Sequence, residues 1–281
     1  MKPTFLFVVA IVFLLAPAEA GAAAYSWDFR NGHFDNLSLV PTGMGAVNLL
    51  RPTKEGLQIQ VPAKYDLKTV GFSPRFTIEG DFEIILDFTI LNRTKPFQGF
   101  GTGPTLYLST GSTSDPAASL GRLLRTDGRD AYAVFAARVE NGVRHPSAKL
   151  FDAPQSQRIT GRLQLKRVKN ELIYSVADDL TSSLRQIAML PMGDGVVTLL
   201  RIGVTQSSPD SAAKVIIHRV QIDADRLPHL PSEQSRTEQL YRPRYQPLPV
   251  PRSLRWLWQA LAACVVVGFG GCWWWKRRLG S

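Results

Sequence analysis

The sequence of 281 residues predicts an all-β fold of the sandwich or barrel type, followed by a C-terminal transmembrane helix. Three observations lead to this prediction. Short runs of β-branched and aromatic residues alternate with clusters of Gly, Asp, Asn, Pro and Ser between Tyr25 and Leu227. No segment longer than ten residues in that region keeps a 3.6-residue apolar period. Near the C-terminus, an uncharged apolar run is long enough to span a bilayer.

The N-terminus has the features of a secretory signal peptide over residues 1–20. Lys2 precedes the apolar run 5–15, and the small-residue sequence AEA follows it. We expect cleavage after Ala20, with Ala24 as the second choice. An uncleaved anchor is the alternative, but the apolar run is short for a bilayer that needs about 20 residues.

The folded domain is expected to span residues 21–227. Strands are predicted at 57–61, 76–91, 105–109, 131–139, 162–168, 171–177, 196–205 and 214–222. Lys169 and Asn170 separate two of these runs, which predicts a hairpin with a two-residue turn. Both cysteines, Cys264 and Cys272, lie outside the domain. The domain therefore has no disulfide, but it is long enough to bury a core without one.

The net charge of +10 belongs mostly to the chain ends. Residues 21–227 hold 24 Lys and Arg against 20 Asp and Glu, so the folded domain carries only +4. These charges are interspersed rather than clustered into a basic stripe, and the composition gives no indication of a nucleic-acid partner.

The C-terminal part predicts a membrane anchor. Six prolines in residues 228–252 predict an extended stalk. Residues 253–275 are expected to form a single transmembrane helix, with tryptophans at both boundaries. The basic tail 276–281 follows and favours the cytoplasmic side, which places the domain outside the cell membrane. A processed sorting tail is the alternative.

Several segments together resemble a known fold family. These are Trp27-Asp28-Phe29 and the stretches GFSPRFTIEGDFEIILDFTIL, GPTLYL, GRLQLKRVKNELIYSV, RIGVT and KVIIHRVQID. In this order they resemble the concanavalin A-like (laminin G-like) jelly-roll domain of uncharacterised exported bacterial proteins. The resemblance covers about residues 25–225 and implies a two-sheet jelly-roll sandwich. It carries more weight for the fold than for the activity.

Glycosidases of this fold class carry a Glu-x-Asp-x-x-Glu segment on one strand, and Glu83 and Asp87 lie on a comparable run. Successive side chains of a strand point to opposite faces, so both acids lie on one face. The other face carries Phe82, Ile84, Leu86, Phe88 and Ile90 and is expected in the core. At about 3.3 Å per residue, the two acids are roughly 13 Å apart. The two catalytic carboxyl groups are roughly 5 Å apart in retaining glycosidases and less than about 10 Å apart in inverting ones. We therefore predict that Glu83 and Asp87 are not catalytic.

Metal and cofactor motifs are weak. The four histidines are scattered, and none is spaced from another His or a Cys as metal ligands are. His145 precedes Pro146 in a predicted loop, and His218 is expected on a strand surface. Acidic residues at Asp127 to Asp130 and at Asp178-Asp179 resemble possible calcium ligands, but we favour the interpretation that they are ordinary turn residues. We expect no cofactor, with calcium as the open alternative.

The ligand-binding candidates are Arg125, Tyr132 and Arg138, which are expected to line an open sheet face. Tyr107 and Tyr174 are further aromatic residues on strands, whereas Trp27 is expected in the core. We predict a membrane-anchored, extracytoplasmic, non-catalytic module that binds carbohydrate or another envelope component. The alternatives are a divergent glycoside hydrolase or polysaccharide lyase, and a structural envelope protein.

Overall fold

The computed structural model describes residues 22–43, 45–64, 69–111, 115–155 and 159–231. The predicted signal peptide, transmembrane helix and cytoplasmic tail, and all but the start of the predicted stalk, lie outside these residues. Within the described ranges, no helix has the length and apolar character needed to cross a membrane.

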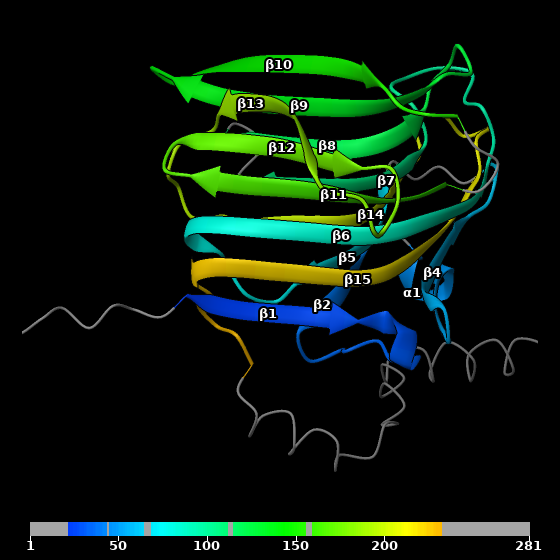
Figure 1. Cartoon of the computed structure of the whole chain (residues 1–281), viewed down its shortest axis with the longest axis horizontal. Coiled ribbons are helices and arrows are strands. Elements are labelled where there is room, and N and C mark those ends of the chain that lie inside the picture. Colours follow the sequence, from blue (N-terminus) through cyan, green and yellow to red (C-terminus); the bar gives the residue numbers. More distant parts are fainter. Residues whose placement is uncertain (1–21, 44, 65–68, 112–114, 156–158, 232–281) are drawn as a thin grey trace, which may run out of the picture. The chain divides into compact units, whose positions relative to one another are not determined.

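The described domain is a sandwich of two antiparallel sheets, which confirms the all-β prediction (Figure 1). The eight-stranded sheet has the order β13-β12-β11-β6-β15-β4-β3, with β1 also paired to β15. Its strands are β1 (Ala23–Asp28), β3 (Leu50–Thr53), β4 (Gly56–Val61), β6 (Glu79–Arg93), β11 (Ile159–Val168), β12 (Glu171–Ala177), β13 (Arg185–Pro191) and β15 (Ala213–Arg226).

The seven-stranded sheet has the order β10-β9-β8-β7-β14-β5-β2 and forms the second layer. Its strands are β2 (Leu39–Thr42), β5 (Thr69–Pro74), β7 (Gly103–Ser109), β8 (Ala117–Leu124), β9 (Asp130–Glu140), β10 (Val143–Asp152) and β14 (Leu199–Thr205). Helical structure among the described residues is limited to η1 (Phe29–Asn31) and α1 (Ala46–Leu49).

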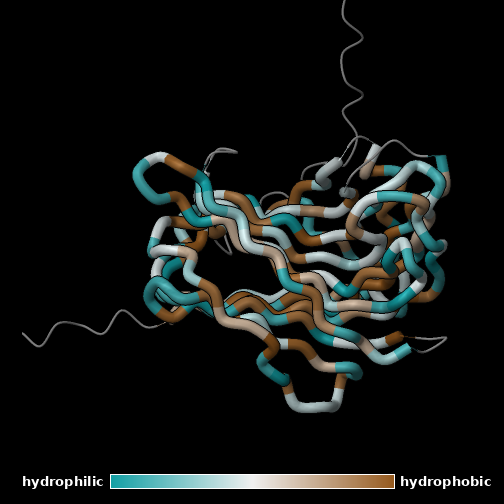
Figure 2. Tube along the Cα trace, turned by 90° about the horizontal axis from the view of Figure 1, so that it is seen from above, coloured by the Kyte–Doolittle hydropathy of each residue, from teal (hydrophilic) through white to brown (hydrophobic). Residues whose placement is uncertain are grey.

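The alternation of the long strand β6 builds the core as predicted. Phe82, Ile84, Leu86 and Phe88 are almost completely buried, whereas Glu83, Ile85 and Asp87 between them are only partly buried. Figure 2 shows hydrophobic and hydrophilic residues interspersed along the strands of the domain. Trp27 also lies in the core, where it stacks on Phe76 and its indole N–H donates to the hydroxyl of Ser38 at 2.7 Å.

The predicted hairpin is confirmed at residue level. Val168 pairs with Glu171, so Lys169 and Asn170 form the two-residue turn between β11 and β12. Lys169 has a φ of 55°, the left-handed conformation that tight hairpin turns require.

One predicted loop is a strand. His145 and Pro146 lie on β10, an edge strand of the seven-stranded sheet, and not in a loop. A proline lacks the N–H needed inside a sheet, but an edge strand has one unpaired side where that loss is tolerated. Because nearly all of β10 is exposed, its sequence lacks the apolar alternation that reveals a half-buried strand.

The chain remains on the domain beyond β15. Leu227 is buried, and Leu230 packs against the core. The backbone N–H of Thr77 donates to the carbonyl of Pro228 at 3.2 Å. The first described residues of the predicted stalk therefore cover part of the sandwich.

Candidate functional site

The segment 94–102 between β6 and β7, here called the aromatic loop, presents two phenylalanines to solvent. The exposed fraction of the side chain is 84% for Phe97 and 74% for Phe100, and no other phenylalanine of the described residues is as exposed. Burying such a ring contributes about 1.5–3 kcal/mol, so a fold gains nothing by leaving both in water. Exposed apolar groups of this kind mark interaction surfaces when they stand close together on one element.

Hydrogen bonds hold the aromatic loop against the segment between β14 and β15. The N–H of Phe97 donates to the hydroxyl of Ser208 at 3.2 Å. The hydroxyl of Ser207 accepts from the N–H of Gly101 and donates to the carbonyl of Gln98, both at 3.0 Å. Because the backbone is fixed on both sides of Phe100, the rings protrude from an ordered support.

Gly101 allows this close support. Its φ is +135°, and a Cβ atom there would lie 2.8 Å from both the Cβ of Leu123 and the carbonyl oxygen of Leu124. Glycine is therefore the residue that lets the aromatic loop lie directly on the end of β8.

Arg125 binds the aromatic loop from the neighbouring turn. This turn, residues 125–129 between β8 and β9, is here called the basic turn. The guanidinium group of Arg125 donates to the carbonyl of Phe100 at 2.6 Å. Arg129 and Asp127 form an exposed ion pair at 2.9 Å on the same turn, and hydrogen bonds from Arg129 lower the pKa of Asp127. Charged groups thus stand beside the exposed rings.

A buried ion pair ties the bases of these two segments together. Arg93, the last residue of β6, contacts Asp130, the first residue of β9, and both side chains are less than 8% exposed. Burial lowers the pKa of Arg93, and the charge of Asp130 opposes this effect. Since β6 and β9 belong to different sheets, the ion pair joins the two layers where the aromatic loop and the basic turn begin and end.

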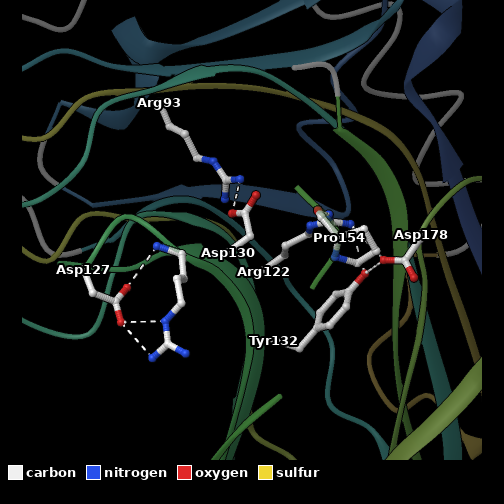
Figure 3. A network of polar contacts seen from close by, with 8 residues as sticks. Arg93, Arg122, Asp127, Asp130, Tyr132, Pro154 and Asp178 are labelled. Atoms are coloured by element: carbon white, nitrogen blue, oxygen red, sulfur yellow. Dashed lines mark hydrogen bonds and ion pairs between the residues drawn. The ribbon is translucent and has the colours of Figure 1, made fainter. Parts of the chain in front are cut away.

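Tyr132 belongs to a second buried network, next to this ion pair (Figure 3). Its hydroxyl donates to the carboxylate of Asp178 at 2.6 Å and accepts from Arg122 at 3.0 Å. Arg122 also donates to the carbonyl of Pro154 at 2.6 Å. Burial raises the pKa of Tyr132 above its usual range. Tyr132 is therefore fully enclosed between the sheets and does not line an open face, contrary to expectation.

Arg138 lies far from Arg125, near the opposite end of β9. Its side chain is 49% exposed and contacts Glu140 at 3.2 Å. The structure therefore does not bring Arg125, Tyr132 and Arg138 into one site. Arg125 lies on the surface beside the aromatic loop, Tyr132 is in the core, and Arg138 lines a separate cavity.

The acidic pairs of the sequence are engaged with protein groups. Asp130 and Asp178 bind the buried arginines described above. Asp179 accepts hydrogen bonds from Ser182 and Thr181, which lower its pKa, as expected of a turn residue. The described part of the chain contains no group of three or more His, Cys, Asp or Glu residues able to hold a metal ion.

Glu83 and Asp87 lie on the outer face of β6, as the alternation predicts. Asp87 forms an ion pair with Arg162 at 3.1 Å, and Glu83 accepts a hydrogen bond from Gln164. Both partners come from the adjacent strand β11. The two acids thus belong to a ladder of polar side chains across strands, and that neither is catalytic stays a prediction.

His218 is also bonded within the domain. Its ring nitrogens lie 2.7 Å from the hydroxyl of Thr89 and 2.7 Å from the carbonyl of Glu55. Tyr174 is buried and donates to the carbonyl of Phe135 at 2.9 Å, whereas Tyr107 is half-buried on β7.

The exposed phenylalanines were not among the predicted site residues. The available signal is the sequence PFQGFG, in which two aromatic residues stand among glycines without a strand-like alternation. Such residues have no sheet face to bury them, and this separates them from the phenylalanines of the predicted strands.

Two solved structures with similar folds show what this domain resembles. One is a crystal structure of LamAcat from Zobellia galactanivorans, with a TM-score of 0.52 and 10% identity over 70% of this chain and 96% of that chain. The other is a prokaryotic β-1,3-1,4-glucanase (lichenase) derived from a mouse hindgut metagenome, with a TM-score of 0.51 and 10% identity over 71% and 98% of the respective chains. These similarities confirm the concanavalin A-like jelly-roll fold, and at this identity they establish the fold alone.

A search of curated proteins finds no match to this sequence. A family model does match, over residues 9–249, and its description is the C domain of a protein of unknown function, DUF1583. This match spans most of the 281 residues. The chain therefore belongs to the DUF1583 C-domain family.

Proposed function

We propose that the domain is a carbohydrate-binding module whose binding surface is formed by the aromatic loop and the basic turn. The observation that carries this proposal is the exposure of Phe97 and Phe100 on a loop with a hydrogen-bonded backbone. Sugar rings have an apolar face of C–H groups that packs on aromatic rings, and a rim of hydroxyls that needs hydrogen-bonding partners. Arg125, Asp127 and Arg129 supply such partners beside the rings.

The ordered support favours binding by a preformed site. A flexible loop would lose conformational freedom when it bound a ligand, which costs about 0.5–1.5 kcal/mol for each immobilised side chain. Here the hydrogen bonds to Ser207 and Ser208, and the Arg93–Asp130 ion pair beneath, are present before a ligand arrives. The fold shared with a β-1,3-1,4-glucanase supports a glucan as the first ligand to test.

The place of the module in the cell is part of the same proposal. The sequence features of residues 1–20 and 253–281 support an exported domain held at the cell membrane by one C-terminal helix. In this arrangement the stalk would present the aromatic loop to polysaccharides of the envelope or of the surroundings.

A polysaccharide retention assay tests the binding proposal. Residues 21–231, which contain the described core, would be run through native gels that contain mixed-linkage β-glucan, laminarin or another polysaccharide. We expect retention by at least one of them, and loss of that retention in the Phe97→Ala/Phe100→Ala variant. Val47→Ala/Met189→Ala is the matched control, because it removes two exposed apolar side chains elsewhere on the domain. Equal retention of both variants would refute the site.

A further inference from the structure

A cavity lies at the edge of the sandwich, away from the aromatic loop. It has a volume of about 250 Å³ and lies between the β9–β10 hairpin of one sheet and β13 of the other. Strand β13 packs against β9, and the seven-stranded sheet continues beyond β9 to β10. The ends of the two sheets are therefore offset, and the inner face of the hairpin stays open toward solvent.

The cavity combines an apolar wall with a polar side. Its lining residues are Ala136, Arg138, His145, Pro146, Ser147, Leu190 and Pro191. Arg138 pairs directly with His145 across the two strands, and Ala136 pairs with Ser147. Directly opposed residues have Cβ atoms about 4.5–5.5 Å apart, so the guanidinium group and the imidazole ring stand together on one face. The buried Leu190 and the ring of Pro191 form the opposite wall.

This pair of side chains suits an anionic group. The guanidinium group of Arg138 is always charged, and the imidazole ring of His145 opposite it can donate a hydrogen bond, so two donors converge at one position. Glu140 already pairs with Arg138, but it contacts Arg138 at Nε and both side chains are about half exposed, so solvent screens the pair. Glu140 thus occupies the Nε donor of Arg138, and the other N–H donors of its guanidinium group remain for a planar carboxylate.

We propose that the cavity binds a single uronic acid residue, with the carboxylate at Arg138 and His145. Its volume falls below the 300–1,000 Å³ of pockets for drug-sized ligands, so it suits one small ring rather than a chain. The ring would pack on the wall formed by Leu190 and Pro191, and the hydroxyl of Ser147 is available in the lining as a partner for a sugar hydroxyl. Leu190 is buried, so the core holds this wall in place.

This site is separate from the surface of the proposed function. Arg138 is eight residues beyond Asp130 on the same strand, which corresponds to roughly 26 Å at about 3.3 Å per residue. A neutral glucan at the aromatic loop and an acidic sugar at the cavity would therefore be recognised independently. Failure of one proposal would not contradict the other.

Calorimetric titration of the full chain, purified in a mild detergent, with D-glucuronate tests the proposal. We expect binding that D-glucose and acetate do not reproduce, because the first lacks the carboxylate and the second lacks the ring. Arg138→Gln should weaken glucuronate binding at least tenfold, in keeping with the loss of a charge-assisted hydrogen bond. Arg138→Lys should weaken it less, because the charge remains while the bidentate geometry is lost.

Two controls make the outcome decisive. Arg129→Gln removes an exposed arginine of the basic turn and should leave glucuronate binding unchanged. Phe97→Ala/Phe100→Ala should also leave it unchanged, which separates this site from the aromatic loop. The proposal is overturned if glucuronate does not bind, if acetate binds equally well, or if Arg138→Gln, with an unchanged circular dichroism spectrum, binds like the wild type.

Discussion

Removing the carboxylate of Asp130 is expected to lower the free energy of unfolding by about 3–5 kcal/mol, the cost of breaking a buried ion pair from one side. The side chains of Arg93 and Asp130 are only 7% and 6% exposed. Burial already lowers the pKa of Arg93, and the nearby charge of Arg122 lowers it further. Asp130→Asn would therefore leave positive charge at the junction of the two sheets without its main compensation.

Urea unfolding of residues 21–231, followed by far-UV circular dichroism, measures this loss. At a slope of about 2 kcal/mol per molar urea, the midpoint should fall by about 2 M. Asp127→Asn is the control, because its ion pair with Arg129 is exposed and should contribute less than about 1 kcal/mol. The double variant Arg93→Met/Asp130→Leu should recover most of the stability, since apolar residues replace a buried pair without a stranded charge.

The reasoning is refuted if Asp130→Asn is no less stable than Asp127→Asn. It also fails if the double variant is as unstable as Asp130→Asn, because the cost would then come from packing rather than from an unpaired charge. The difference in stability between these variants therefore tests whether the Arg93–Asp130 ion pair holds the aromatic loop and the basic turn together.

Three further predictions concern the loop, the core strand and pH. Gly101→Ala should destabilise the domain by more than about 1 kcal/mol in urea unfolding, because its φ of +135° and the backbone of Leu124 leave no room for a Cβ; a neutral effect would contradict this. In the same assay Leu86→Ala should cost about 2–5 kcal/mol and Asp87→Asn less than about 2 kcal/mol, and the reverse order would refute the register of β6. Burial raises the pKa of Tyr132, so the unfolded chain loses this proton near pH 10 while the folded chain retains it. Stability should therefore fall as the pH rises above about 10, and Tyr132→Phe should reduce that slope by about 1.4 kcal/mol per pH unit; an unchanged slope would show that Tyr132 is not held as described.

The sequence predicted those parts of the fold that depend on local alternation. Strand β6 has large apolar residues at every second position, and the hairpin at Lys169 combines two such runs with a short turn. Several strands were absent from the prediction, and four of them show a physical cause. Strand β10 is exposed on nearly all its length, β2 and β3 have only four residues each, and β8 carries a glycine and a buried arginine.

The candidate site was harder to predict because its contacts join distant segments. Arg125 was identified as a candidate, but its contact with Phe100 depends on the way β7 and β8 bring two loops together. Tyr132 was expected on an open face. The four alanines of β9 leave its sequence without a clear alternation of large apolar and polar residues, so the sequence does not show which face of the strand is buried. Only the placement of the second sheet shows that this tyrosine faces inward and bonds with Arg122 and Asp178.

The central claim is that the aromatic loop contacts the carbohydrate, and an NMR titration of residues 21–231 with labelled phenylalanine rings tests it most directly. The titrant is whichever polysaccharide the retention assay identifies, used as a short oligosaccharide. Binding to the aromatic loop predicts that the ring signals of Phe97 and Phe100 shift with the ligand, while Phe135 on the seven-stranded sheet does not respond. Shifts at Phe135 with no change at Phe97 and Phe100 would place the ligand on the sheet face and contradict the proposed site.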